Sequence, residues 1–529
     1  MRRAILLITA AAVALGPVSA QPYYSQPAQQ PYPQPYPQGG MPQQGRYLDP
    51  RDVAEAQREN AVMVQELGGA ETGARAAYVN SVGHRVAAFS GVASPGQAIH
   101  FTSLNSPVEN AFSVPGGYVY VTRQLMGLMD DEAELAFALG HEVGHIAANH
   151  AHAREAYARQ SNWLPSILGA VFGNSIFGSM IGQDVARRSK LQTLSFSRDQ
   201  EYQADELGMR YMMQAGYDPV GAPEVLAALS RASALQVRIQ GKSSRQTPEW
   251  ASTHPLSENR MQRALAAARQ TGRLGQGIKN RDGFLAQLDG TYVDDDPAQG
   301  VIDGALFTHP DLRIQFRVPQ GYLMSNGTTA VSISGGAGKA QFGGGRFGGS
   351  LDQYILQVYQ ELTGGQMRLS VPPPQRVMIN GMPVAVTTAR VNSRSGVVDA
   401  SVVAYQWAPD RVYHFVMLTR GGAGTQPFIP MINSLRKISV AEGNAIRPRI
   451  IDIVTVRPSD TVQSLAAQMA YRDYQLDRFL SLNGLAPGAR LAPGRKVKLV
   501  VYGPRRMVNP GASTRANAVR PKPGGVSAA

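Results

Sequence analysis

The chain has 529 residues, of which 43% are hydrophobic, and this length and composition predict two to four globular domains. It contains no cysteine, which excludes a fold held by disulfides. Its formal net charge of +13 favours anionic surfaces such as lipid headgroups or cell-wall polymer. No nucleic-acid-binding motif accompanies this charge, so we expect no nucleic-acid partner.

The first twenty residues have the pattern of a secretory signal. Arg2 and Arg3 precede an apolar stretch that ends at Leu15, and the small residues Ser19 and Ala20 follow. The apolar stretch is too short to span a bilayer. We therefore expect residues 1–20 to be a signal peptide that is removed on export.

Residues 21–47 form a low-complexity segment rich in Pro, Gln and Tyr. Such a composition buries too little apolar surface to form a core. We expect a disordered linker here, before a domain that begins at residue 48.

Residues 110–121 alternate as a β-strand does. Asn110, Ala111 and Phe112 begin the pattern, Pro115-Gly116-Gly117 suggests a turn, and residues 118–121 continue it. An exposed strand edge can pair with an extended peptide through main-chain hydrogen bonds. An ordinary core hairpin is the alternative that the pattern leaves open.

The motif H-E-V-G-H at 141–145 carries the clearest chemical signal, within an apolar helical run. His141 and His145 are four residues apart and share one helical face, so both imidazoles can bind one Zn²⁺. Glu142 points in a neighbouring direction and can take a proton from a metal-bound water. The acidic residues at 130–134 suit the start of this helix.

A catalytic zinc site needs a further protein ligand and an open position for water. Glu201 and Asp205 lie four residues apart on one face of a second expected helix. Glu201 can bind the metal, and Asp205 can accept the outer N–H of a bound imidazole. Spacing alone does not distinguish this role from a solvated acidic face. We interpret His150 and His152 as structural residues at a helix end.

Residues 163–183 carry no charge and approach the length of a bilayer-spanning helix. Pro165, Asn174 and several glycines and serines interrupt the segment. We therefore expect a lid or a hairpin in peripheral contact with a membrane, and a true span or a core helix are the alternatives.

Three motifs together resemble a known family: N-A-F-S-V-P-G-G-Y-V-Y-V-T-R at 110–123, D-E-A-E-L-A-F-A-L-G-H-E-V-G-H at 131–145 and S-R-D-Q-E-Y-Q-A-D at 197–205. They are similar to the CAAX-prenyl-protease/HtpX-type zinc metallopeptidases, which are gluzincins with an H-E-x-x-H motif, in their soluble periplasmic BepA-like branch. The resemblance implies a mainly α zincin-type peptidase domain with a small edge sheet over residues 48–275.

The resemblance also implies roles for the residues of these motifs. It makes His141, His145 and Glu201 the ligands of one Zn²⁺ per chain, Glu142 the general base and Asp205 an outer partner of a ligand. It implies further that the strand beginning Asn110-Ala111-Phe112 binds the substrate backbone.

The segment S-T-H-P-L-S-E-N-R at 252–260 resembles the family pattern as well. His254 is assigned to the catalytic residues, where it stabilises the oxyanion or occupies the open zinc position and holds the enzyme off. Arg260 is assigned to substrate binding, and it anchors this loop or binds a carboxylate. A loop histidine before Pro255 is the plain alternative.

The implied function is a zinc-dependent endopeptidase that cleaves misfolded or misassembled proteins of the cell envelope, located in the periplasm with a membrane or cell-wall association. Two other functions stay open. One is a zinc peptidase directed at peptidoglycan, and the other is a catalytically latent envelope chaperone or scaffold.

Residues 301–440 are predicted to form a separate α+β domain without a catalytic constellation. Alternating segments indicate strands, Asn380-Gly381 indicates a hairpin turn, and 352–362 and 427–435 read as helices. The glycine-rich residues 338–349 lack the G-K-S/T of a phosphate-binding loop, so we expect a flexible loop there.

Residues 453–501 resemble a LysM module, through T-V-R-P-S-D-T-V-Q-S-L-A at 455–466, F-L-S-L-N-G-L at 479–485 and L-A-P-G-R-K-V-K-L at 491–499. The resemblance implies a β-α-α-β unit that binds N-acetylglucosamine polymers such as peptidoglycan. Ser459 replaces the usual glycine, and a structural spacer is the alternative. Residues 502–529 are expected to be a basic disordered tail.

Overall fold

The computed structural model describes residues 48–92, 99–151, 196–240, 254, 258–328, 330–363, 370–393 and 396–503. The expected signal peptide, the linker at 21–47 and the segment 163–183 lie outside these residues, as does nearly all of the expected tail. No helix among the described residues has both the length and the apolar character to cross a membrane.

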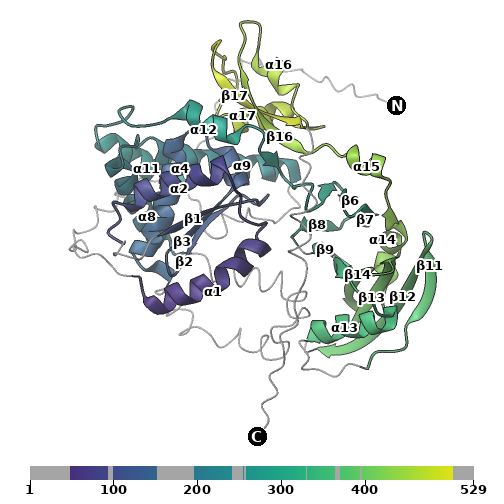
Figure 1. The fold of residues 1–529 in the computed structure, drawn as a ribbon. Helices are drawn as coiled ribbons and strands as arrows, with labels where there is room; N and C mark the ends of the chain where they lie inside the picture. Colours follow the sequence, from purple (N-terminus) through teal and green to yellow (C-terminus); the bar gives the residue numbers. More distant parts are fainter. Residues whose placement is uncertain are drawn as a thin grey trace, which may run out of the picture. The chain divides into compact units, whose positions relative to one another are not determined.

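The N-terminal half is built mostly of helices around a small sheet (Figure 1). Its helices are α1 (Pro50–Glu66), α2 (Ala74–Ala87), α3 (Arg123–Leu128), α4 (Glu132–Ala147), α8 (Arg198–Gln214), α9 (Gly221–Gln240), α11 (Glu258–Gln270) and α12 (Arg281–Leu288). Its strands are β1 (His100–Leu104), β2 (Ala111–Val114) and β3 (Tyr118–Thr122). The strand order is β1-β3-β2, with β1 parallel and β2 antiparallel to β3, so β2 lies at an edge.

The side chains of β3 alternate between two hydrophobic clusters, one on each face of the sheet. Val119 and Val121 belong to the main core, whereas Tyr118 and Tyr120 pack with Ala56 of α1 in a smaller cluster. This is the alternation that the period of a β-strand requires. Figure 1 accordingly shows α1 on one side of the sheet and α2 and α4 on the other.

Helix α4 is buried along nearly its whole length, and glycines set its contact with α8. A Cβ on Gly208 would lie 2.7 Å from the backbone nitrogen of His141, and one on Gly140 would lie 3.1 Å from the carbonyl oxygen of Gly208. Side chains at these positions would push the two helices apart. Asp131 caps α4, and Ser197 and Gln200 form a capping box on α8.

The described residues between 301 and 444 contain two further sheets. A four-stranded sheet has the order β15-β7-β6-β5, and a seven-stranded sheet has the order β11-β12-β13-β14-β10-β9-β8. The strands are β5 (Val301–Asp303), β6 (Leu306–His309), β7 (Ile314–Arg317), β8 (Leu323–Asn326), β9 (Val331–Gly335), β10 (Gly338–Arg346), β11 (Gln375–Ile379), β12 (Met382–Ser393), β13 (Gly396–Ala408), β14 (Arg411–Arg420) and β15 (Arg436–Lys437). The helices are α13 (Leu351–Thr363), η1 (Gln426–Phe428), α14 (Ile429–Ser434) and α15 (Val440–Asn444).

The structure bears out the predicted hairpin and corrects the predicted loop. Asn380 and Gly381 both have positive φ and join β11 to β12, as a tight hairpin turn requires. The expected flexible loop is wrong for most of its length, because residues 338–346 form β10. The absence of a Cβ lets this strand approach β14: a Cβ on Gly344 would lie 2.4 Å from the carbonyl oxygen of Val412.

The C-terminal part follows the order β16 (Arg449–Thr455), α16 (Val462–Ala466), α17 (Gln475–Leu482) and β17 (Lys496–Tyr502). Its two strands pair antiparallel, and β4 (Tyr292–Val293) adds a third strand beside β16. Phe479, Val497 and Leu499 share one continuous core with Leu135 and Leu139 of α4. The described residues therefore form a multidomain α+β protein; the finer domain boundaries stay predictions.

Candidate active site

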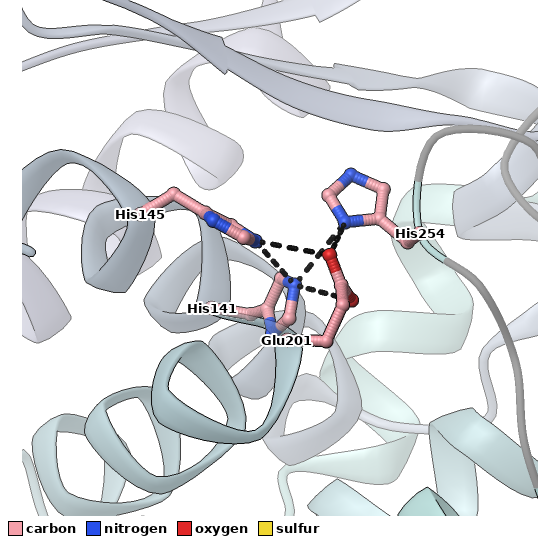
Figure 2. Close-up of side chains that lie close together, drawn as sticks. All are labelled: His141, His145, Glu201 and His254. Carbon is pink, nitrogen blue, oxygen red and sulfur yellow. Dashed lines mark hydrogen bonds and ion pairs between the residues drawn. The ribbon is translucent and has the colours of Figure 1, made fainter. Parts of the chain in front are cut away.

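Four buried side chains converge where α4 meets α8. His141 and His145 come from α4, Glu201 comes from α8, and His254 lies shortly before α11. One potential ligand atom from each lies within 4.8 Å of the others (Figure 2). Residues separated by more than a hundred positions thus meet at one point.

The distances within this cluster are short. The Nε2 atoms of His141 and His145 are 3.0 Å apart, and each lies 3.5 Å from an oxygen of Glu201. The Nδ1 atom of His254 lies 3.0 Å from Oε1 of Glu201 and 3.3 Å from Nε2 of His141. His254 is therefore a member of the cluster, in direct contact with Glu201 and His141.

Outer partners determine where the ring protons of the two α4 histidines sit. The carboxylate of Asp205 lies 2.9 Å from Nδ1 of His141, an ion-pair distance that favours a proton on that atom. Nε2 of His150 donates to Oε1 of Gln203 at 3.0 Å, which leaves Nδ1 of His150 to accept from Nδ1 of His145 at 2.9 Å. Both Nε2 atoms are therefore left with lone pairs.

These two lone pairs point at one another across 3.0 Å, close to a carboxylate. Such an arrangement is repulsive unless a cation lies between the atoms. Two neutral imidazoles and one carboxylate are a donor set that binds divalent transition metals. The residues therefore fit a metal ion.

The charges around the cluster keep two of its groups, His145 and Glu201, in the forms that a metal needs. Burial lowers the pKa of His145 well below its usual value, which keeps that ring neutral. Burial opposes ionisation of Glu201, but His254 and the Arg260 guanidinium hold the pKa of Glu201 well below the ordinary range. Burial likewise opposes ionisation of Asp205, but Arg260 keeps the pKa of Asp205 low. Metal binding requires these deprotonated forms.

Glu142 lies beside the cluster and is only 2% exposed. The hydroxyl of Ser113, on β2, donates to Oε2 of Glu142 at 3.0 Å. Nε2 of His254 lies 3.4 Å from Oε1 of the same carboxylate. Glu142 is thus placed between the edge strand and the histidines.

Arg260 is buried against carboxylates of the protein itself. Its side chain is 3% exposed, donates to both carboxylate oxygens of Asp205 at 2.8 and 2.6 Å and pairs with Glu201. It binds carboxylates of the protein, because a buried guanidinium needs fixed anionic partners. These contacts agree with the alternative that Arg260 binds carboxylates and positions Asp205 and Glu201, and the substrate-binding assignment stays a prediction.

The expected substrate strand meets this site at Ser113 of β2, which contacts Glu142. Ala111 and Phe112 begin β2, and Asn110 immediately precedes the strand. The side-chain oxygen of Asn110 is buried and has no hydrogen-bond partner within the described part of the chain. A buried acceptor of this kind is suited to a donor that arrives with a ligand.

Three contacts of the site were not anticipated from the sequence. His150 sets the tautomer of His145, Ser113 donates to Glu142, and Phe196 stacks on the ring of His145 with centroids 3.8 Å apart. The His150 position, five residues after His145, lies beyond the regular end of α4, where Asn149 has a positive φ. Helical periodicity could not place it.

Comparison with known proteins places this site in a family. Residues 73–268 match the profile of Peptidase family M48. This segment is an M48 peptidase domain. The M48 domain contains all four clustered residues together with Glu142.

Relatives of the M48 domain share about a third of its residues. The beta-barrel assembly-enhancing proteases of Yersinia pestis and Escherichia coli K12 are 32% and 31% identical over 200 and 201 residues, which cover 36% of this chain and 39% of theirs. The mitochondrial metalloendopeptidase OMA1 of Arabidopsis thaliana is 31% identical over 193 residues, covering 34% of this chain and 35% of that protein. The similarity thus spans about two fifths or less of the length of these relatives.

Proposed function

We propose that this chain is a zinc-dependent endopeptidase of the cell envelope. The observation that carries the proposal is the approach of the Nε2 atoms of His141 and His145 to 3.0 Å, with Glu201 beside them and the buried Glu142 next to them. Ligand atoms about 2.0–2.1 Å from a tetrahedral Zn²⁺ lie roughly 3.3–3.4 Å apart, close to the 3.0 and 3.5 Å measured here. His141, His145 and Glu201 would hold this ion, which when bound lowers the pKa of a water and polarises a carbonyl.

The side chains of this chain supply the remaining steps. The Glu142 carboxylate takes a proton from the attacking water and returns it to the leaving amine. The Ser113 hydroxyl donates to Oε2 of Glu142, and Oε1 lies 3.4 Å from Nε2 of His254 in the cluster. The edge of β2 and the acceptor of Asn110, both without a partner among the described residues, bind the backbone of an extended peptide.

We propose further that His254 holds the resting enzyme in a latent state. Its Nδ1 atom lies among the ligand atoms, where it would occupy the fourth position of a metal held by the other three residues. A catalytic site keeps that position open for water. Movement of the His254 side chain away from the other three groups would then permit catalysis, and the alternative role for His254 is stabilisation of the oxyanion.

The biological setting is also a proposal. The expected signal peptide and the similarity to beta-barrel assembly-enhancing proteases support periplasmic location and substrates among misfolded or misassembled envelope proteins. The β-α-α-β order of 449–502 supports binding of peptidoglycan through residues 453–501, and with it the alternative of a peptidoglycan-directed peptidase. Peripheral membrane contact through 163–183 and a non-enzymatic chaperone role are the remaining proposals.

A trapping experiment tests the function. Glu142→Gln retains the shape and the ligands but removes the base, so it should retain uncleaved substrates when the tagged full-length chain is recovered from envelope preparations. We expect envelope proteins to be enriched over the wild type, with purified muropeptides left intact by the active enzyme. Cleavage of muropeptides without any trapped protein would favour the peptidoglycan-directed alternative, and equal recovery with both chains would favour the chaperone.

A further inference from the structure

Ser113 belongs to the edge strand β2 and contacts the proposed general base directly. Its hydroxyl donates to Oε2 of Glu142 at 3.0 Å. The other oxygen of this carboxylate, Oε1, lies 3.4 Å from Nε2 of His254. Among the described residues of β2, Ser113 is therefore the one that holds the side chain of Glu142 by a hydrogen bond.

The alternation of side chains along β2 explains why Ser113 faces α4. Phe112 stacks on Tyr120 with ring centroids 4.7 Å apart, and both side chains pack in the small cluster with α1. Neighbouring side chains of a strand point to opposite faces of the sheet. Ser113 therefore points to the other face, where α4 carries Glu142.

The main chain of Ser113 points away from β3. The backbone N–H of Thr122 donates to the carbonyl oxygen of Asn110 at 3.0 Å, so the main-chain groups of Asn110 face β3. These groups alternate in direction along an antiparallel strand. The N–H and C=O of Ser113 therefore face the opposite edge of β2, which has no partner among the described strands. A peptide that pairs with this edge would bond to Ser113 itself.

Ser113 thus has its main chain on the edge that would bind the substrate and its side chain on the base. β2 is four residues long and, among the described strands, is paired on one side only. Hydrogen bonds on the second side would reduce the conformational freedom of such a strand. Pairing with a peptide would therefore restrain Ser113 and, through its hydroxyl, the carboxylate of Glu142.

We propose that Ser113 is a positioning residue that couples the binding of an extended peptide to the placement of the general base. This inference rests on the proposed endopeptidase function. Proton transfer needs the base within hydrogen-bonding reach of the attacking water, and a small misplacement lowers the rate strongly. Binding of peptide residues distant from the scissile bond then raises kcat and does not only lower KM. The preferred substrate class is an extended, unfolded polypeptide long enough to pair with β2.

The test measures kcat and KM separately for peptides of increasing length that share one scissile sequence, with the full chain at equal, measured zinc content. In the wild type we expect kcat to rise with length, because longer peptides pair with more of the β2 edge. Ser113→Ala removes the hydroxyl but keeps the main chain, so KM for the longest peptide should stay the same. Its kcat should fall about tenfold or more, as expected for one hydrogen bond to a charged group, and should no longer depend on length.

Two further variants show whether the hydroxyl itself is responsible. Ser113→Thr retains a hydroxyl at a position where a β-branched residue suits the strand, so it should restore both the rate and its dependence on length. Ser103→Ala is the matched control, because Ser103 of β1 also donates its hydroxyl to a carboxylate, that of Glu71, which is outside the catalytic cluster. It should leave kcat and its length dependence as in the wild type.

A double variant shows whether Ser113 acts through Glu142. Glu142→Gln alone removes the base and leaves a residual rate. If the Ser113 hydroxyl works by placing the base, adding Ser113→Ala to this variant should lower the residual rate no further. Two independent contributions would instead multiply.

The outcomes separate this inference from the proposed function. A wild type that cleaves peptides with a kcat independent of length overturns the coupling and leaves the endopeptidase intact. The same holds if Ser113→Ala keeps the wild-type length dependence, loses only in KM, or lowers the residual rate of Glu142→Gln by its full factor. A zinc-loaded wild type that cleaves no peptide would instead overturn the proposed function, and this inference with it.

Discussion

At the scale of single residues, the site depends on where protons sit. His150 and Gln203 fix the proton of His145 on Nδ1, while Asp205 does the same for His141. Arg260 in turn holds Asp205 through two hydrogen bonds. These outer contacts direct both Nε2 lone pairs toward a single point, which is what a metal ion needs from its ligands.

Replacing His150 should therefore weaken metal binding without removing a ligand. In His150→Ala, Nδ1 of His145 loses its partner, and the ring becomes free to turn or change tautomer. Loss of an outer partner commonly lowers metal affinity 10–100-fold. Competition with a chromophoric zinc chelator measures this change, with the exposed His84→Ala as control. Equal affinity in His150→Ala and the wild type would show that His150 is not a partner of the metal site.

His254→Ala tests the proposed latency. If His254 occupies the open position at rest, its removal should raise basal hydrolysis of casein while zinc content stays the same. A role in oxyanion stabilisation predicts the opposite, a decrease of about 10²–10³ in rate. The rate of proteolysis at equal zinc loading distinguishes the two directions, and no change returns His254 to an ordinary loop residue.

The sequence predicts the inner residues of the site better than the outer ones. His141, His145 and Glu201 follow from helical spacing and the family motifs, and the structure places them together. Whether each binds a metal stays a prediction. The contacts of His150 and Gln203 depend on how the irregular end of α4 packs against α8, which no local pattern encodes. Arg260 lies next to the cluster, but its contacts with Asp205 and Glu201 depend on tertiary packing, which the sequence does not show.

At the scale of elements, the close packing of α4 on α8 brings Glu201 to the histidines. Gly140, Gly144 and Gly208 line this contact, and a Cβ at any of them would lie 2.7–3.1 Å from backbone of the facing helix. Glycine costs helix stability of about 1 kcal/mol per residue relative to alanine. The close approach of the two helices accounts for its presence here.

Gly208→Ala should thus destabilise the protein despite the higher helix propensity of alanine. The new Cβ would meet the backbone of Gly140 and His141, and overpacking of this kind typically costs about 1–3 kcal/mol. Denaturant unfolding should show this loss together with weaker zinc binding. Glu206→Ala, at an exposed position of the same helix, should be neutral or slightly stabilising. A Gly208→Ala protein as stable as the wild type would contradict the packing argument.

Among the elements themselves, predictions from turn chemistry and periodicity succeed where local rules dominate. The Asn380-Gly381 hairpin and the helix at 351–363 form as their sequences predict. Residues 338–346 form a strand rather than the predicted loop. A glycine-rich segment can pair as a strand where the neighbouring strand requires a close approach. That requirement comes from β14, far along the chain, and composition does not reveal it.

At the scale of the whole molecule, residues 449–502 form a C-terminal module that shares one core with the M48 domain. Lys498 of β17 is fully buried, and its Nζ donates to the carbonyl oxygens of Gly127 and Met129 and pairs with Asp130 at 3.1 Å. These three residues immediately precede the cap of α4. The module therefore supports the helix that carries His141 and His145.

Lys498→Met should destabilise the M48 domain itself. The substitution keeps the apolar stem but leaves Asp130 and two carbonyls without their partner, and breaking a buried pair in this way commonly costs about 3–5 kcal/mol. Thermal unfolding of the full chain should record the loss. Lys496→Met is the matched control, since Lys496 lies on the same strand as Lys498 but pairs with the largely exposed Asp282 of α12, and its loss should change little. Equal effects of the two substitutions would contradict the support role.

The most direct test of the central claim compares proteolysis by the wild type and Glu142→Gln at equal, measured zinc content. The account predicts about one zinc per chain in both and a loss of about 10²–10⁴ in the rate of casein hydrolysis in the variant. Glu206→Gln, an exposed change on α8, should leave both quantities unaltered. Undiminished hydrolysis by a zinc-loaded Glu142→Gln chain, or a folded wild type that binds no zinc, would contradict the account.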